Sequence, residues 1–147
     1  MNKKNNKTLA REFALQTLYQ WDISNEPMAE VLIKFEQDHS FANVDRSYWY
    51  AITTYIGQHV GEIDEMILPF VKRSLQSIDP VERAVLRLAF YEMAHCMQVP
   101  YRVVINESLE LVKQFGAEEG YRFINGVLDS AAVKMRSLEK TGDDRKR

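Results

Sequence analysis

The hydrophobic positions of this chain recur with the period of an α-helix from its first apolar segment to its last. Apolar residues three and four positions apart predict about seven helices, and no run shows the strict alternation that is typical of a β-strand. We therefore expect an all-α protein. The first segment illustrates the pattern, because its apolar and small side chains share one helical face: Ala10, Phe13, Ala14, Thr17, Leu18 and Trp21.

Polar residues at the ends of the periodic segments predict where helices begin. Thr8 is a candidate N-cap for the first helix and Asp45 for the third, because a short polar side chain can accept a hydrogen bond from a free amide. Asp79-Pro80-Val81-Glu82 is the strongest start signal. It combines an N-cap, a proline at the first helical position and an acid at the third.

The middle of the chain contains residues that weaken a helix. Gly57 and Gly61 are expected to loosen the end of the third helix, so a fourth helix is expected to begin near Glu62. Pro69 lies inside that fourth pattern and should kink or divide it. The pattern therefore predicts about three helices before Gly61 and four after it.

The composition is that of a globular protein without a covalent framework. The chain has 147 residues, of which 46% are hydrophobic and 27% are charged, and this balance is ordinary for a folded domain. The single cysteine, Cys96, excludes an internal disulfide and favours a reducing compartment. No segment reaches the roughly 20 mainly apolar residues of a membrane-spanning helix. We expect a cytoplasmic protein.

Charge is distributed unevenly along the chain. The formal net charge is -2, yet residues 1–11 contain four cations and no acid, namely Lys3, Lys4, Lys7 and Arg11. A basic segment on an acidic body is typical of a tail that binds a polyanion such as a nucleic-acid backbone. The same charge pattern also fits a solubilising, disordered terminus, so both interpretations stay open at this point.

Residues that carry enzyme chemistry are sparse. The chain has no glycine-rich phosphate-binding loop and no dinucleotide fingerprint. His39, His59 and His95 are scattered, without metal-ligand spacing to a second thiol or a carboxylate cluster. Cys96 cannot face His95, because neighbouring residues on a helix diverge by about 100°. We predict no catalytic residue, no metal site and no cofactor.

Four segments carry a resemblance to a known family: AREFALQTLYQW from residue 10, VERAVLRLAFYE from residue 81, VPYRVVINESLELVKQFG from residue 99 and FINGVLD from residue 123. With these segments in this order, the chain resembles the NusB family of bacterial transcription antitermination factors from about Leu9 to Leu138. The resemblance implies the NusB-like fold, with helical subdomains at about 9–61 and 62–139. A flexible basic arm, 1–8, would precede them, and a disordered tail, 140–147, would follow.

The resemblance implies an RNA-binding surface, because NusB proteins bind a single-stranded RNA element called boxA. In the family, an arginine-rich stretch before the Ala-Arg-Glu of the first helix takes part, and the N-terminus of the last helix faces the RNA. Ala10-Arg11-Glu12 matches, but the preceding NKKNNKT has lysines and asparagines in place of arginines, which predicts weaker and less selective binding. The expected RNA-binding residues are Lys3, Lys4, Lys7, Arg11, Glu119, Arg122 and Phe123.

Two of these residues have alternative roles. Phe123 falls at the border of the buried stripe of its helix, so it could equally be a core residue. Glu119 would oppose phosphate and is expected to tune affinity. Outside this set, Asn106 and Asn125 are expected to be buried and to fix a helix crossing, and Gly126 to permit a close approach of helices.

The resemblance also implies protein partners. NusB proteins pair with NusE, a ribosomal protein of the small subunit, and the pair binds boxA more tightly than either protein alone. The matching positions are Tyr19, whose hydroxyl can reach a partner from the edge of the apolar stripe, and Glu82, which also has a sufficient role as a capping acid. The complex would dock on elongating RNA polymerase with other Nus factors. A homodimer is a further option.

Two other functions stay open. NusB-like domains also occur in some ribosomal RNA cytosine methyltransferases, so the chain could be such a domain in isolation. Alternatively, it could be a helical adaptor that binds protein and not RNA, a function that the missing arginines favour.

Overall fold

The computed structural model describes residues 4–137 and 139, and in this part of the chain it contains helices and no strand. The prediction of an all-α protein is confirmed. Six α-helices and two 3-10 turns follow one another: α1 (Asn6–Ser24), α2 (Met28–Asp38), α3 (Arg46–Ile67), η1 (Leu68–Phe70), η2 (Leu75–Ser77), α4 (Pro80–His95), α5 (Tyr101–Phe115) and α6 (Glu118–Met135).

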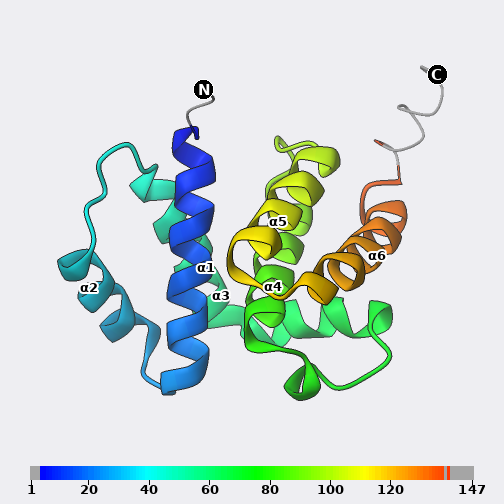
Figure 1. Cartoon of the computed structure of the whole chain (residues 1–147), viewed down its shortest axis with the longest axis horizontal. Coiled ribbons are helices and arrows are strands. Elements are labelled where there is room, and N and C mark those ends of the chain that lie inside the picture. Colours follow the sequence, from blue (N-terminus) through cyan, green and yellow to red (C-terminus); the bar gives the residue numbers. More distant parts are fainter. Residues whose placement is uncertain (1–3, 138, 140–147) are drawn as a thin grey trace.

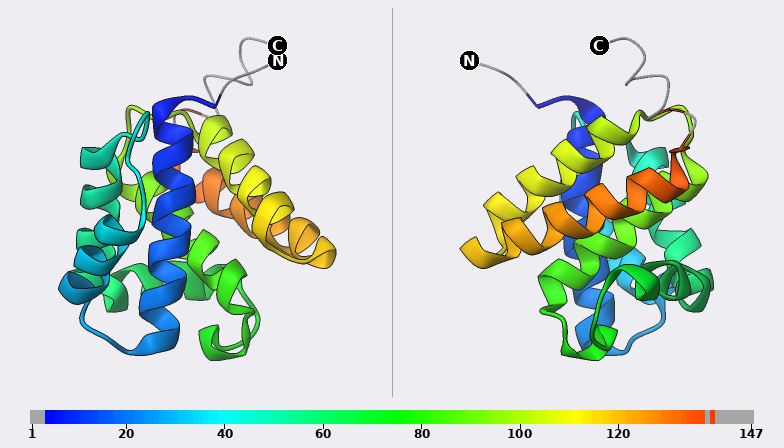
Figure 2. Two further views of the ribbon diagram at one scale, coloured as in Figure 1. Left: turned by 60° about the vertical axis from the view of Figure 1, so that its left-hand side comes forward. Right: turned by 90° about the vertical axis from the view of Figure 1, so that its right-hand side faces the viewer.

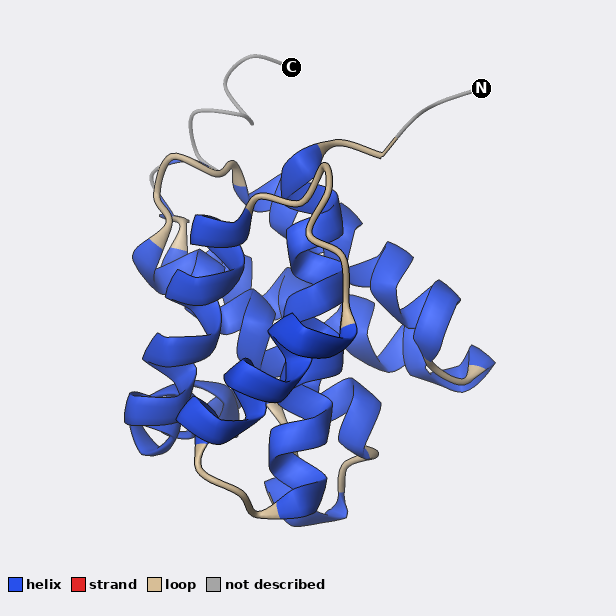
Figure 3. Ribbon diagram, turned by 90° about the vertical axis from the view of Figure 1, so that its left-hand side faces the viewer, coloured by secondary structure: helices blue, strands red, loops and turns tan. Residues whose placement is uncertain are grey.

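Helix α4 is the centre of the fold. It packs against α1, α3, α5 and α6, and every residue from 82 to 93 is buried (Figure 1). Helix α2 covers the other side of α1 and α3, whereas α5 and α6 lie side by side and project from the body beyond α1 (Figure 2). Loops and turns connect consecutive helices (Figure 3). Helix α4 is therefore the core helix of the fold, although it contains charged residues. None of the helices described is long and apolar enough to cross a membrane.

The predicted break between a third and a fourth helix is present, as a kink inside one helix, α3. Helix α3 continues from Arg46 to Ile67, with a kink at His59, whose φ of -128° and ψ of 31° are not helical. The chain changes direction at this kink (Figure 1), and Ile56 and Ile63 on either side of it are both fully buried in the core. The helix ends just before Pro69, which lies in the turn η1.

Helix starts agree with the sequence at two of three places. Asp79 and Asp45 cap α4 and α3 as predicted: Asp79 accepts hydrogen bonds from two amides of the following turn, and Asp45 accepts one from the Tyr48 amide. Thr8 is not a cap, because α1 starts at Asn6, where the Asn5 side chain accepts from the Thr8 amide at 2.7 Å. The first helix therefore extends into the segment predicted as a flexible arm. Lys3, Leu138 and the tail 140–147 lie outside the described residues.

Candidate nucleic-acid interface and partner groove

Arg11 lies inside the protein. It is 3% exposed, and its guanidinium donates to both carboxylate oxygens of Glu92 at 2.9–3.1 Å and to Glu107 at 3.1 Å. The Tyr48 hydroxyl also donates to Glu92, and the Thr8 hydroxyl donates to Glu107 at 2.6 Å. The expectation that Arg11 presents its charge to RNA at the surface is corrected: the arginine joins α1 to α3, α4 and α5.

The charge of Arg11 is held firmly in this environment. Burial by itself lowers the pKa of Arg11, but the hydrogen bond to Glu92 and its negative charge outweigh burial and raise the pKa above its usual value. The pKa of Tyr48 is also raised, by burial first and then by the charge of Glu92. Arg11 and Tyr48 therefore keep their protons, and no buried polar side-chain atom in the described residues lacks a hydrogen-bond partner.

The two lysines of the N-terminal segment remain at the surface. Lys4 pairs with Glu12 at 2.6 Å and donates to Gln114 at 3.0 Å, whereas Lys7 lies 3.4 Å from Asp45. About half of each lysine side chain is exposed, and both line a groove of about 850 Å³ at the amino ends of α1 and α5. The acidic partners are less exposed than the lysines, because the side chain of Glu12 is only 11% exposed and that of Asp45 is 26% exposed.

A second groove runs along the start of α6. Arg122 and Phe123 come from α6, Glu82 comes from α4, and the loop after η1 contributes Lys72 and Arg73. Phe123 is half-buried and packs against the core, and the Arg73 guanidinium carbon lies 4.8 Å from the centroid of its ring. Phe123 is therefore both a core residue and a groove residue, because its ring packs against the core and also lines the groove.

Glu82 lies at the bottom of this second groove. It is 7% exposed, and a Cβ atom placed on Gly120 of α6 would come within 2.8 Å of its carboxylate. Burial raises the pKa of Glu82, the negative charges of Asp79 and Glu119 raise it further, and the positive charge of Arg73 partly opposes them. The carboxylate faces α6, so it does not share a groove with Tyr19.

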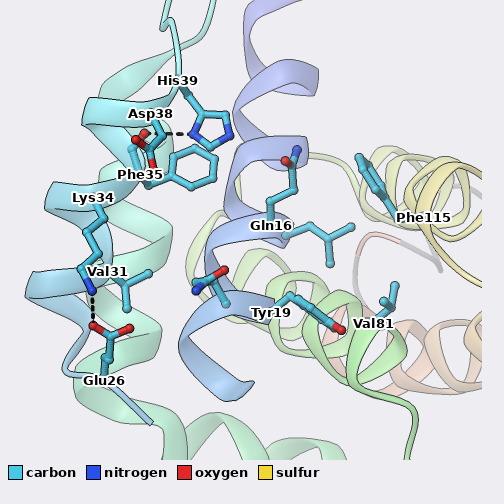
Figure 4. A pocket seen from close by; sticks show the side chains of 12 residues that line it. Gln16, Tyr19, Glu26, Val31, Lys34, Phe35, Asp38, His39, Val81 and Phe115 are labelled. Atoms are coloured by element: carbon cyan, nitrogen blue, oxygen red, sulfur yellow. Dashed lines mark hydrogen bonds and ion pairs between the residues drawn. The ribbon is translucent and has the colours of Figure 1, made fainter. Parts of the chain in front are cut away.

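Tyr19 lines a third groove, on the opposite side of the start of α4 (Figure 4). Its side chain is 39% exposed and extends from α1 toward Val81. The groove has a volume of about 560 Å³, and its walls come from α1, α2, α4 and the end of α5. They are mainly apolar, with Leu15, Val31, Phe35, Val81 and Phe115 among the lining residues.

The start of α4 separates these two grooves. Val81 lines the Tyr19 groove, and its neighbour Glu82 lines the groove of Phe123. Adjacent residues on a helix point about 100° apart, so one helix end can form a wall of both. A partner in either groove would therefore contact the same turn of the same helix.

Comparison with known proteins shows the family to which the chain belongs. The profile of the NusB family matches residues 8–133. The chain belongs to the NusB family. It is 40% identical over 138 residues to the transcription antitermination protein NusB of Hydrogenovibrio crunogenus, covering 94% of this chain and 86% of that protein. These relatives are regulators of transcription, in agreement with the prediction that the chain is not an enzyme.

Solved NusB structures share the fold. The solution structure of NusB from Aquifex aeolicus matches with a TM-score of 0.75 and 30% identity, covering 92% of both chains. A chain in the crystal structure of antitermination factors NusB and NusE in complex with double-stranded RNA matches with a TM-score of 0.71 and 28% identity, covering 84% of this chain and 93% of that one. The predicted NusB-like fold is confirmed.

The polar residues of the NusB signatures are not the packing devices that the sequence suggested. Asn106 is exposed, Asn125 is half-buried, and a Cβ atom on Gly126 would meet nothing within 4 Å. The close helix approach instead occurs at Gly120. Gly126 lines the groove beside Phe123, so the glycine leaves open space at the candidate interface.

Sequence reasoning missed other residues of this NusB protein. Arg73 and Lys72 were not singled out, although two adjacent cations between periodic segments were a visible signal. Glu92 and Arg136 were missed because their partners are distant in the sequence. Arg136 is buried at the end of α6 and donates to four carbonyl groups at the end of α4 and beyond, those of Glu92, Met93, Cys96 and Val99.

Proposed function

We propose that this protein is a transcription antitermination factor that binds boxA-like single-stranded RNA of ribosomal RNA transcripts together with NusE. The complex assembles on elongating RNA polymerase with other Nus factors, in the cytoplasm. Membership of the NusB family carries the proposal, and the two grooves on either side of the start of α4 support it.

The RNA surface is proposed to include the N-terminal cations and the start of α6. Lys3, Lys4 and Lys7 supply charge for the phosphodiester backbone, and Arg122 with Phe123 supplies a cation and an aromatic ring at the second groove. The contact of Lys4 with Gln114 places one of the N-terminal cations near the end of α5, and α6 begins just after this end. An extended RNA strand could follow α5 from one group to the other.

Acidic residues limit the strength of this surface. To bind a phosphate, Lys4 must give up its ion pair with Glu12, and Lys7 its ion pair with Asp45. In the second groove, Glu119 lines the same surface as the cations. Each exchange offsets part of the gain from a phosphate contact. We therefore expect modest affinity for RNA alone and a stronger requirement for NusE, with Glu119 tuning the affinity.

The Tyr19 groove is proposed as the NusE site. It is apolar, and Tyr19 combines a large apolar surface with a hydroxyl that can donate a hydrogen bond, a combination that is common at protein interfaces. Glu82 lies one residue beyond the groove wall, so NusE and RNA would meet at the first turn of α4. The solved complex that contains NusB, NusE and RNA supports this pairing, although its RNA is double-stranded.

A titration of fluorescently labelled boxA RNA tests the proposed function. At low salt the protein should bind boxA RNA more tightly than a scrambled RNA of the same composition, and NusE should increase the affinity. Absence of measurable binding both with and without NusE would refute the proposal. Light-scattering masses with and without RNA would show whether a homodimer covers the same surface.

A protein-only adaptor is the second candidate. It is favoured by the observation that Lys4 and Lys7 already have acidic partners within the protein. This function would replace the first if the protein binds NusE but does not bind RNA, either alone or in the presence of NusE.

A further inference from the structure

The loop between η1 and η2 brings a cation over the ring of Phe123. Arg73 lies in this loop, and its guanidinium carbon is 4.8 Å from the centroid of the ring. This distance is within the range of a cation–π contact, and the delocalised guanidinium can stack on an aromatic face. The groove that contains Arg73 and Phe123 also has Lys72 and Arg122 in its lining.

Arg73 differs from the arginines of the nearby helix α4. Arg83 and Arg87 are buried and pair with Asp22 and Asp64 at 2.7–3.0 Å, so their charges hold helices together. Arg73 is exposed, and within residues 4–137 and 139 its guanidinium makes no hydrogen bond or ion pair. Its nitrogen donors and the outer face of its guanidinium are therefore available to a ligand.

The groove suits a nucleobase. Its volume of about 850 Å³ is large enough for one or two nucleotides, and Phe70, Val71 and Val127 form apolar walls. Ser77 and Asp79 add polar groups that can pair with the edge of a base. A nucleobase has apolar faces and polar edges, and single-stranded RNA is commonly bound by stacking its unpaired bases on aromatic rings and arginine planes.

We propose that Arg73 is an RNA-binding residue, which forms with Phe123 a stacking platform for one nucleobase. The base stacks on the outer face of the Arg73 guanidinium, and the Phe123 ring, anchored in the core, supports the other side of that guanidinium. Lys72 and Arg122 attract the flanking phosphates. This inference rests on the proposed RNA-binding function and adds a residue and a mode of contact to it.

The proposal predicts that the shape of Arg73 matters as well as its charge. Lysine keeps the positive charge but lacks the plane that stacks between a ring and a base. Arg73→Lys and Arg73→Ala should therefore both weaken RNA binding, by roughly tenfold, the effect that is typical of losing one stacked base. A phosphate contact alone would instead let lysine replace arginine with little loss.

The test is an RNA titration of the full-length protein with NusE present, using boxA RNA in which 2-aminopurine replaces one base at a time. One position should change its fluorescence on binding to the wild-type protein, and both Arg73 variants should lose that change. Arg46→Lys is the matched control, because Arg46 also lies over a ring, that of Phe41 at 4.4 Å, outside this groove. The control should bind like the wild type.

The outcomes separate this inference from the proposed function. If the wild-type protein does not bind RNA, the proposed function itself fails. If it binds RNA but Arg73→Ala binds equally well, or if Arg73→Lys restores full affinity and the fluorescence change, the stacking platform is refuted while the RNA-binding function stands. A loss of NusE binding by the Arg73 variants in the absence of RNA would also overturn the inference.

Discussion

Arg11→Met should destabilise the fold strongly without removing an RNA phosphate contact. The guanidinium makes three hydrogen bonds to Glu92 and one to Glu107, and the side chains of Arg11 and Glu92 are almost fully buried. Methionine is similar in length and apolar, so it fills much of the same space. The carboxylate of Glu92 would then remain buried with a hydrogen bond from the Tyr48 hydroxyl but without a cation to neutralise its charge.

The magnitude follows from the cost of an unpaired buried charge. Removing one partner of a buried ion pair typically costs about 3–5 kcal/mol. Each kcal/mol lowers the melting temperature of a domain of this size by about 2–4 °C, so the expected decrease is roughly 6–20 °C. Replacing Glu92 by leucine in the same variant should recover much of this loss, because apolar substitutes for a whole buried pair are often neutral.

Two assays are needed for this prediction. Thermal and urea unfolding followed by circular dichroism give the change in stability, and RNA titrations at several salt concentrations, well below the melting temperature, give the salt dependence. The salt slope of Arg11→Met should equal that of the wild type. A decrease in stability below about 1 kcal/mol, or a salt slope reduced as it would be if one phosphate were no longer neutralised, would show that Arg11 is a surface ligand.

Three further predictions test other parts of the structure. Lys4→Gln and Lys7→Gln should weaken RNA binding and lower its salt slope by up to about 0.7 for each phosphate that is no longer neutralised, and unchanged slopes would remove these lysines from the interface. Gly61→Ala should stabilise the protein by about 0.5–1 kcal/mol, whereas Gly57→Ala should destabilise it by about 1–3 kcal/mol. The reason is that an added Cβ at Gly57 meets the Met28 side chain closely, whereas an added Cβ at Gly61 meets nothing within 4 Å. Equal effects of the two variants in urea unfolding would contradict this. Because folding raises the pKa of Glu82, the wild type should lose stability as the pH rises from the pKa of the unfolded state through that of the folded state. Glu82→Gln should be more stable than the wild type above this pH range and equally stable below it. A gain in stability that does not depend on pH would refute the raised pKa of Glu82.

Helical phase predicted the core of α1 well, and it failed at Arg11 for a specific reason. Charged residues are expected at the surface, and the two acids that neutralise Arg11 lie 81 and 96 residues further along the chain. No local pattern identifies such partners. The contact between Arg73 and Phe123 was missed for the same reason, because a loop and a helix far apart in sequence form it.

The middle of the chain shows a second limit of sequence patterns. The sequence predicts Gly57 and Gly61 together as weak points of a helix, and the kink at His59 lies between them. It does not predict that Gly57 makes room for Met28 of α2 whereas Gly61 has open space around it. Whether a glycine ends a helix, kinks it or admits a neighbour depends on what lies opposite. In contrast, Asp79-Pro80 at the start of α4 was predicted correctly because an N-cap acts on amides of its own first turn.

The most direct test is the affinity for boxA RNA measured with and without saturating NusE. Because RNA and NusE are proposed to meet at the first turn of α4, NusE should tighten RNA binding, and RNA should tighten NusE binding by the same factor. Tyr19→Ala should weaken NusE binding, while leaving binding of RNA alone unchanged. RNA affinity that is the same with and without bound NusE would contradict the joint surface, and no RNA binding under either condition would refute the proposed function.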